Sequence, residues 1–379
     1  MPKPEPGDKT IEWSWGQELS GALGDLGILL PYLLAAIRVL GMNPSGLLAG
    51  FGLLYLFSGW FYRLPMAVQP MKAASAAFLT ERMTPGQVAA AGIIMGAFLL
   101  LLGLSGVIQK LVEITPRAVA GGIQLGLGLL LALLGFDLMK EDMVLGIACT
   151  VAMLLLLTKA RLPSALIILI GGSLAGNLLH PVAVWPALHW GWHLPSLIWP
   201  SSGDWVSTLY LVALPQTPLT ITNAVLVTAA LSRQLYGERA VRVSEKSLLF
   251  TMGLANLLMS PWGAYPMCHG SGGVAAHYRF GARTQIAPYF IGSILLVLGL
   301  GLGSDSAVLF SLIPLSVLGT LLLFSGIDMA RAVNLDEEKE QILLIIVVVG
   351  LTLIINPGVA FLTGLLLGWG QKKLALNRL

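Results

Sequence analysis

Two stretches bring polar and small residues together inside an otherwise apolar chain. Residues 64–78 read LPMAVQPMKAASAAF, and residues 265–280 read YPMCHGSGGVAAHYRF. Glycines let a ligand approach bare backbone amides, and the Gln69 amide and the Ser271 hydroxyl are hydrogen-bond donors. This donor set favours the binding of an anion. The candidate binding residues of the two stretches are Gln69, Pro70, Met71, Lys72, His269, Gly270, Ser271, Gly272 and Gly273.

Each stretch leads into a predicted helix that is too short to cross a membrane, over 69–82 and 269–281. The first amides of a helix have no intrahelical partner, and lipid cannot satisfy them. The helix dipole adds about half a positive charge at the same end. Two such ends that face each other near the bilayer midplane form an anion site. Pro70 suits the first helical turn, where no N–H is required.

Lys72 is the lysine that lies well inside an apolar segment. A charge there costs ~2.5–3.5 kcal/mol on insertion scales. We therefore expect Lys72 to face an anion or Asp25. The alternative is a side chain that reaches back to the membrane surface.

Asp25 lies among Gly21, Gly24 and Gly27 in an apolar segment. Such a buried acid is a functional candidate by default. It can pair with Lys72, carry a coupling proton if burial raises its pKa, or make a structural hydrogen bond, and the sequence leaves these three roles open.

A third polar segment reads LPQTPLTITNAV, over 214–225. Pro215 and Pro218 are expected to break this helix and expose carbonyl groups. Gln216, Thr217 and Asn223 are the candidate binding residues here.

Metal binding and catalysis are not expected. Cys268, His269 and His277 give too few ligands, with no carboxylate near them in the sequence. Cys268 and His269 are adjacent, and neighbouring side chains seldom face each other as a nucleophile and its base do. We expect His269 to form hydrogen bonds at the site entrance and His277 to pack within the bundle. The chain is therefore not predicted to be an enzyme, and no cofactor or metal is predicted.

The composition places these residues in a membrane protein. The chain has 379 residues, of which 56% are hydrophobic and 11% are charged, and its mean hydropathy is +0.82. Soluble proteins carry about 25% charged residues. The predicted fold class is therefore an all-α polytopic membrane protein with the lipid bilayer as its partner, and nucleic acid is not an expected partner.

Fourteen membrane elements are predicted, and the third and the tenth are the half-helices. Their ranges are 17–40, 43–62, 69–82, 85–104, 114–136, 141–158, 163–179, 206–232, 244–260, 269–281, 284–303, 306–328, 339–355 and 357–371, with a small interfacial helix at 107–113. With the N-terminus inside, eighteen Lys and Arg residues fall on the cytoplasmic side and three on the outside. This bias predicts that both termini lie in the cytoplasm.

The two halves of the chain resemble each other. Pro65-Met66 and Pro266-Met267 precede the two half-helices, and Pro116, Gly121 and Asp137 recur as Pro314, Gly319 and Asp328. Seven elements is an odd number, so the copies would enter the membrane in opposite orientations. A 7+7 inverted repeat with interrupted helices is typical of secondary transporters.

The segments ELSGALGDLG, PMAVQPMKAASA and PMCHGSGGVAAHYRFGART resemble the molybdate transporter family, a branch of the sulfate permease superfamily. The second half-helix departs from the family pattern where Ser271, Val274 and His277 stand in place of Ala, Gly and Gln. The resemblance implies core and gate subdomains, an elevator-like motion between them, and no cytoplasmic regulatory (STAS) domain after the last helix. The implied divisions are a cytoplasmic tail (1–16), a first repeat (17–180, core 17–104, gate 114–180), an outer loop (181–205), a second repeat (206–372, core 206–303, gate 306–372) and a second tail (373–379).

The predicted function is import of a tetrahedral oxyanion, with molybdate first, by a secondary active transporter. The anion would lie between the two half-helix ends, and protons are candidates for co-transport through Asp25. Sulfate or tungstate is the alternative within the class. A nucleobase–proton symporter is disfavoured because no carboxylate occurs at 206–232 or 266–281. The expected location is a bacterial inner membrane, and the oligomeric state stays open, with a homodimer as one option.

Overall fold

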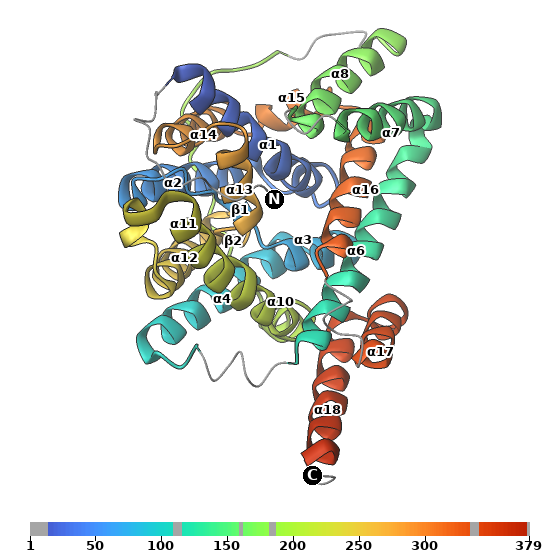
Figure 1. Cartoon of the computed structure of the whole chain (residues 1–379). Coiled ribbons are helices and arrows are strands. Elements are labelled where there is room, and N and C mark those ends of the chain that lie inside the picture. Colours follow the sequence, from blue (N-terminus) through green and yellow to red (C-terminus); the bar gives the residue numbers. More distant parts are fainter. Residues whose placement is uncertain (1–13, 109–115, 159–161, 182–186, 334–340, 377–379) are drawn as a thin grey trace.

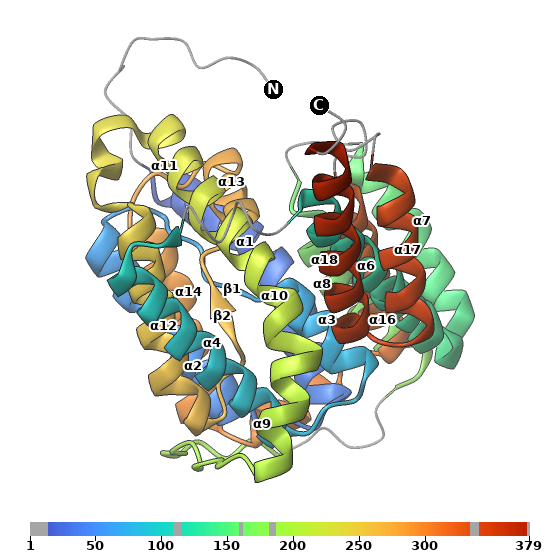
Figure 2. The same cartoon turned by 90° about the horizontal axis from the view of Figure 1, so that it is seen from below.

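The computed structural model describes residues 14–108, 116–158, 162–181, 187–333 and 341–376. The helices form two groups, which lie side by side in two perpendicular views (Figures 1 and 2). The first group contains α1 (Trp15–Arg38), α2 (Pro44–Tyr62), α3 (Lys72–Thr80), α4 (Pro85–Ser105), α9 (Ser202–Thr208), α10 (Leu214–Leu219), α11 (Thr228–Tyr236), α12 (Glu245–Met259), α13 (Ser271–Arg279), α14 (Ile286–Leu296) and the strands β1 (Gln69–Pro70) and β2 (Met267–Cys268). The second contains α6 (Arg117–Met139), α7 (Met143–Leu157), α8 (Ser164–Leu179), α16 (Leu315–Arg331), α17 (Ile342–Ile354) and α18 (Pro357–Leu376), and α15 (Asp305–Ser311) connects the two.

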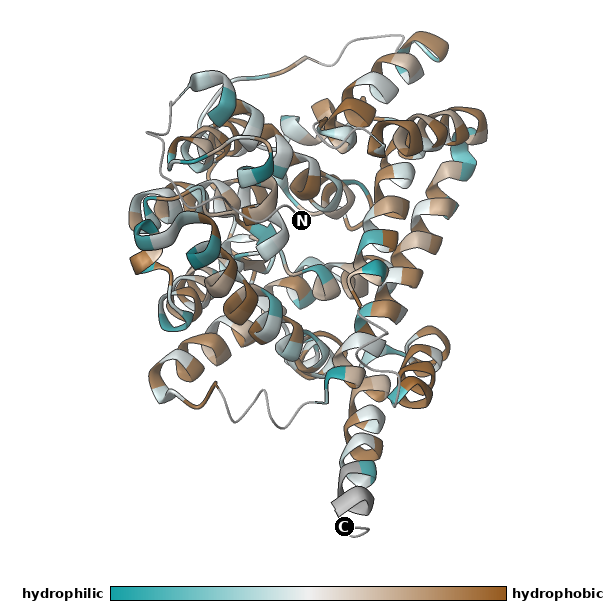
Figure 3. Ribbon diagram, viewed as in Figure 1, coloured by the Kyte–Doolittle hydropathy of each residue, from teal (hydrophilic) through white to brown (hydrophobic). Residues whose placement is uncertain are grey.

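The outer faces of the helices are apolar, as a lipid environment requires. Brown, hydrophobic residues cover much of α7 and α8 (Figure 3), where Val144, Leu155, Leu174 and Leu178 are exposed. Within the described ranges, five helices are long and apolar enough to cross a membrane, or six if a bent pair counts as one span. Each of the fourteen predicted elements has a helical counterpart, whereas the small helix at 107–113 falls largely outside the described residues.

The two predicted half-helices are present but begin later than expected. Helices α3 and α13 have nine residues each and start at Lys72 and Ser271. The residues before them are extended, and β1 pairs antiparallel with β2, with Gln69 opposite Cys268. The expectation that Pro70 stands in the first helical turn was therefore wrong, because Pro70 lies in β1, opposite Met267.

The segment with Pro215 and Pro218 is not broken as predicted. A single helical span continues from Ser202 to Arg242, with π-helical turns at Leu209–Ala213 and Thr220–Val227 on either side of α10. A proline removes an amide and clashes with the preceding turn. The wider π turns relieve both effects, and such turns often mark functional sites.

The predicted helix 306–328 is two helices instead. Helix α15 ends at Ser311, and Pro314 is the N-cap residue of α16. Because Pro cannot continue a helix at this point, the chain turns before it. Pro116 has the same place before α6, so the aligned proline motifs mark equivalent helix starts.

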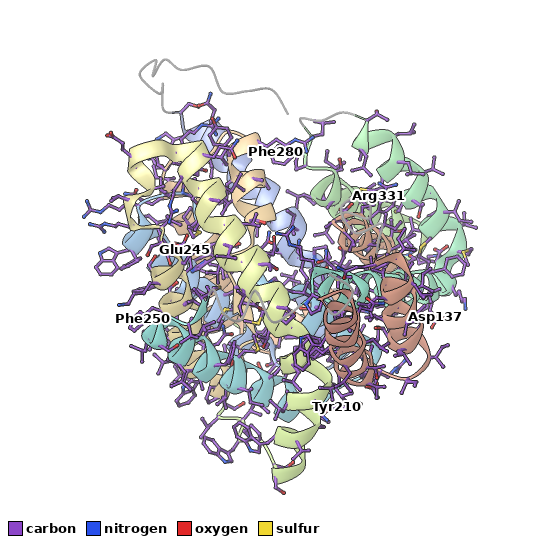
Figure 4. The ribbon with its side chains drawn as sticks, turned by 60° about the horizontal axis from the view of Figure 1, so that its bottom comes forward. Asp137, Tyr210, Glu245, Phe250, Phe280 and Arg331 are labelled. Carbon is purple, nitrogen blue, oxygen red and sulfur yellow. The ribbon has the colours of Figure 1, made fainter. Side chains whose placement is uncertain are left out.

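Helix α6 packs closely along α16 through paired glycines. A methyl group on Gly319 would lie 2.5 Å from the carbonyl oxygen of Gly135, and a methyl group on Gly135 would lie 2.6 Å from that of Gly319. Close backbone contact through small residues is a common way to associate helices in lipid. The two groups also touch at Tyr210 (Figure 4), whose carbonyl and ring lie against Gly358 of α18.

This contact predicts that Gly319→Ala lowers stability by about 1–3 kcal/mol, because the added methyl group must push two helix backbones apart. Thermal unfolding of the detergent-purified protein measures the change. Gly171→Ala is the matched control, since nothing lies within 4 Å of its added methyl group. Equal unfolding temperatures for the two variants would contradict this account of the helix pair.

Candidate anion-binding site

The β1–β2 pair brings the starts of the two half-helices together. The Met71 amide donates to the Pro266 carbonyl at 3.0 Å, directly before α3 begins. The amides of Lys72 and Ala73 in α3, and of Ser271 and Gly272 in α13, donate to no backbone carbonyl of the described residues. Four unpaired amides at two helix starts are a donor set that an anion can satisfy.

The Lys72 side chain reaches from α3 to the start of α13. Its ammonium lies 3.7 Å from the position of a methyl group on Gly272. Within the described ranges, no carboxylate lies within ion-pair distance of this ammonium. A cation at the positive end of a helix is repelled by the dipole, and an anion bound between them would remove this repulsion.

Asn223 and Ser271 form the open side of the site. The Ser271 hydroxyl donates to the Asn223 side-chain oxygen at 2.5 Å, which leaves the Asn223 amide group as a further donor. Asn223 lies in the π-helical turn Thr220–Val227. Asn223 and Gly272 are exposed, and Lys72 and Ser271 are partly exposed. These residues therefore line an accessible surface between the half-helix ends.

Gln216 and Thr217 have other partners. The Gln216 side-chain oxygen accepts from the Ala74 amide at 2.7 Å, so Gln216 caps the first turn of α3. Its amide group donates to Thr220 at 2.9 Å. Thr217 donates to the Ala213 carbonyl of its own helix at 2.8 Å. Gln216 thus supports the site, and the Thr217 hydroxyl already has a partner within its own helix.

We expected His269 at the site entrance. The structure contradicts this, because the His269 side chain is fully buried. Its Nδ1 lies 2.9 Å from the Ala67 carbonyl, and its Nε2 lies 3.0 Å from the Thr251 hydroxyl. The ring therefore connects the lead-in of one half-helix to that of the other. Asn256 adds to this support, since its side chain accepts from the Met267 amide at 2.8 Å and donates to the Met267 carbonyl at 2.7 Å.

Gln69 and Asp25 form a second buried network. Gln69 donates its amide group to Asp25 Oδ1 at 2.8 Å, and Tyr55 donates its hydroxyl to Asp25 Oδ2 at 2.5 Å. Asp25 makes no ion pair with Lys72, and His277 lies beside it with Nε2 at 3.1 Å from Oδ2. The structure therefore contradicts the ion pair with Lys72 and shows Asp25 as a hydrogen-bonded acid, which is compatible with the proton-carrying role. Tyr55, Thr251 and Asn256 lie in apolar or mixed helices, where no local pattern marked them.

The comparisons with known proteins agree with this geometry. Residues 17–131 and 208–329 match the family described as "Molybdate transporter of MFS superfamily". The chain belongs to this molybdate transporter family. The two matched ranges include both half-helix stretches, and the family is one of transporters and not of enzymes.

Curated relatives and solved structures extend the family match. The chain is 30% identical to "Molybdate transporter 2" of Arabidopsis thaliana over 87% of this chain and 81% of the relative. It is 28% identical to "Molybdate transporter 1" of Chlamydomonas reinhardtii, over 94% and 90%.

The fold is similar to that of the transmembrane domain of the cyanobacterial bicarbonate transporter BicA, with a TM-score of 0.66 at 17% identity, over 91% and 96% of the chains. A similar likeness holds for SLC26A9, with a TM-score of 0.66 at 13% identity, over 93% and 64%. These likenesses confirm the expected sulfate-permease type of membrane fold.

The free amides predict that Gly272→Val weakens binding of molybdate by about tenfold or more, since one lost hydrogen bond to a charged group is worth about 1.5–3 kcal/mol. The added methyl groups would cover the amide surface and crowd Lys72. Titration of the purified protein with molybdate measures the affinity. Gly203→Val is the control, because Gly203 is also the second residue of a helix and has no neighbour within 4 Å of an added methyl group. An unchanged affinity for Gly272→Val would place the anion elsewhere.

Proposed function

We propose that this protein is a secondary active transporter that imports a tetrahedral oxyanion, with molybdate as the first candidate. The observation that carries the proposal is the meeting of two half-helix starts with the unpaired Lys72 ammonium. Unpaired amides and a cation match an anion with oxygen on every side. The names of the relatives favour molybdate within the oxyanion class.

Recurring helix pairs support a 7+7 inverted repeat. Helix α2 packs on α14 as α4 packs on α12, and α7 packs on α8 as α17 packs on α18. Inversion exchanges the second element with the ninth and the fourth with the eleventh, so each pair maps onto its counterpart. The proposed core is 17–104 with 206–303, and the proposed gate is 114–180 with 306–372.

An elevator-like motion follows from this division. The half-helices, the β1–β2 pair and their supporting networks belong to the core, while α3 packs against α6 of the gate. A core that slides along the gate would carry the complete anion site from one side of the membrane to the other. If both termini lie in the cytoplasm, 18 of the 22 Lys and Arg residues fall on that side, which is the bias expected of a plasma-membrane protein.

Uptake of labelled molybdate by proteoliposomes tests the function. We expect saturable uptake that unlabelled molybdate and tungstate reduce, with sulfate as a measure of selectivity and uracil without effect. Competition by sulfate alone would change the substrate to sulfate. Competition by uracil without any effect of molybdate would replace the proposal with nucleobase transport.

Lys72→Gln tests the role of the ammonium. It should weaken molybdate binding by about 10- to 100-fold, because a hydrogen bond to a charged group contributes about 1.5–3 kcal/mol. Lys140→Gln is the control, since Lys140 is exposed and pairs with Asp137 on the surface. Equal affinity in the two variants would remove Lys72 from the binding site.

A further inference from the structure

We propose that Asp25 and His277 form a buried site that binds one proton and couples it to transport of the anion. The inference rests on the proposed transport function and assigns its coupling ion. Both side chains of the pair have no exposed surface, so each polar atom needs a partner within the protein.

The partners of His277 leave the pair one proton short if Asp25 is charged and His277 is neutral. Nδ1 lies 3.1 Å from the Gly21 carbonyl, and Nε2 lies 3.1 Å from Asp25 Oδ2. Both neighbours of the ring are acceptors. In either neutral tautomer, one ring nitrogen would place its lone pair against an oxygen.

One additional proton resolves the conflict. It can lie on His277 as an imidazolium beside the Asp25 carboxylate, or on Asp25 Oδ2 facing a neutral Nε2. The Nε2–Oδ2 contact has the distance of an ion pair but not the alignment of a hydrogen bond. Tyr55 and Gln69 serve as donors to the two oxygens of Asp25 in both cases. The pair is then neutral as a whole, which burial favours.

The other elements around Asp25 add no competing charge at contact distance. Helix α2 contributes Tyr55, β1 contributes Gln69, and α13 contributes His277. Glu18, two turns earlier on α1, accepts from the Arg283 and Thr284 amides, and Lys72 lies toward Gly272. Within the described ranges, His277 is the one ion-pair partner of Asp25.

Gln69 connects this pair to the anion site. Its amide group donates to Asp25, and its oxygen lies 2.4 Å from the position of a methyl group on Gly270, the N-cap residue of α13. Loss of the proton would leave a net negative charge beside this helix start. It would also place a lone pair of the His277 ring against an oxygen of Asp25 or Gly21. Both effects disfavour a bound dianion, so proton binding and anion binding favour each other reciprocally.

The test measures coupling and binding separately. In wild-type protein, the affinity for molybdate should rise by about tenfold as pH is lowered from roughly 8 to 6, because proton binding and anion binding favour each other. Asp25→Asn and His277→Gln should make the affinity independent of pH. In proteoliposomes, both variants should lose uptake driven by an inward proton gradient while retaining exchange of internal for external molybdate. The Gln side chain can still donate to the Gly21 carbonyl that His277 contacts, so His277→Gln should fold even if Asp25→Asn does not.

His269→Gln is the control, because this second buried histidine has one neutral partner for each ring nitrogen. It should change exchange and gradient-driven uptake by the same factor. Wild-type affinity that is equal at every pH, or gradient-driven uptake that persists in both variants, would overturn the coupling site. If the wild-type protein neither binds nor exchanges molybdate, the proposed function fails instead.

Discussion

A backbone amide inside a bilayer must find a partner within the protein or in a ligand, because lipid offers none. The two half-helix starts depend on this constraint. Most amides around them are paired: Met71 with Pro266, Ala74 with Gln216 and Met267 with Asn256. Among the described residues, the amides of Lys72, Ala73, Ser271 and Gly272 at the two helix starts donate to no backbone carbonyl. These four amides lie near the Lys72 ammonium, and such a group of donors is what an anion site requires.

Two buried networks support the β1–β2 pair near the end where Gln69 lies opposite Cys268. One joins Tyr62, Thr251 and His269 to the Ala67 carbonyl. The other joins Tyr55, Gln69 and His277 through Asp25. A two-stranded pair of two residues each is too short to be stable alone. The side-chain networks take the place of further strands, and they therefore fix the geometry of the amides at the proposed anion site.

The sequence predicted the parts of this design that have a local signature. The length of the apolar segments predicted the helices, and the Pro-Met dipeptides with nearby glycines predicted the half-helices. It misplaced His269, Gln69 and Pro70, because the direction of a side chain depends on a pairing between residues about 200 positions apart. It also missed Tyr55, Thr251 and Asn256, since a polar group in a mixed helix has no pattern until its partner is known. The prolines of α10 were expected to break a helix that π turns keep continuous.

The likeness to a bicarbonate transporter limits what the fold can decide about the substrate. Backbone amides and helix dipoles attract any anion, and they do not distinguish a planar one from a tetrahedral one. Discrimination must come from side chains at the open face, where Lys72, Ser271 and Asn223 lie. The Ser271–Asn223 hydrogen bond fixes one carboxamide at this face, where it would contact the proposed anion, and the π turn sets its position. Substrate choice in this family is therefore expected to depend on a few side chains around the shared backbone amides of the two half-helix starts.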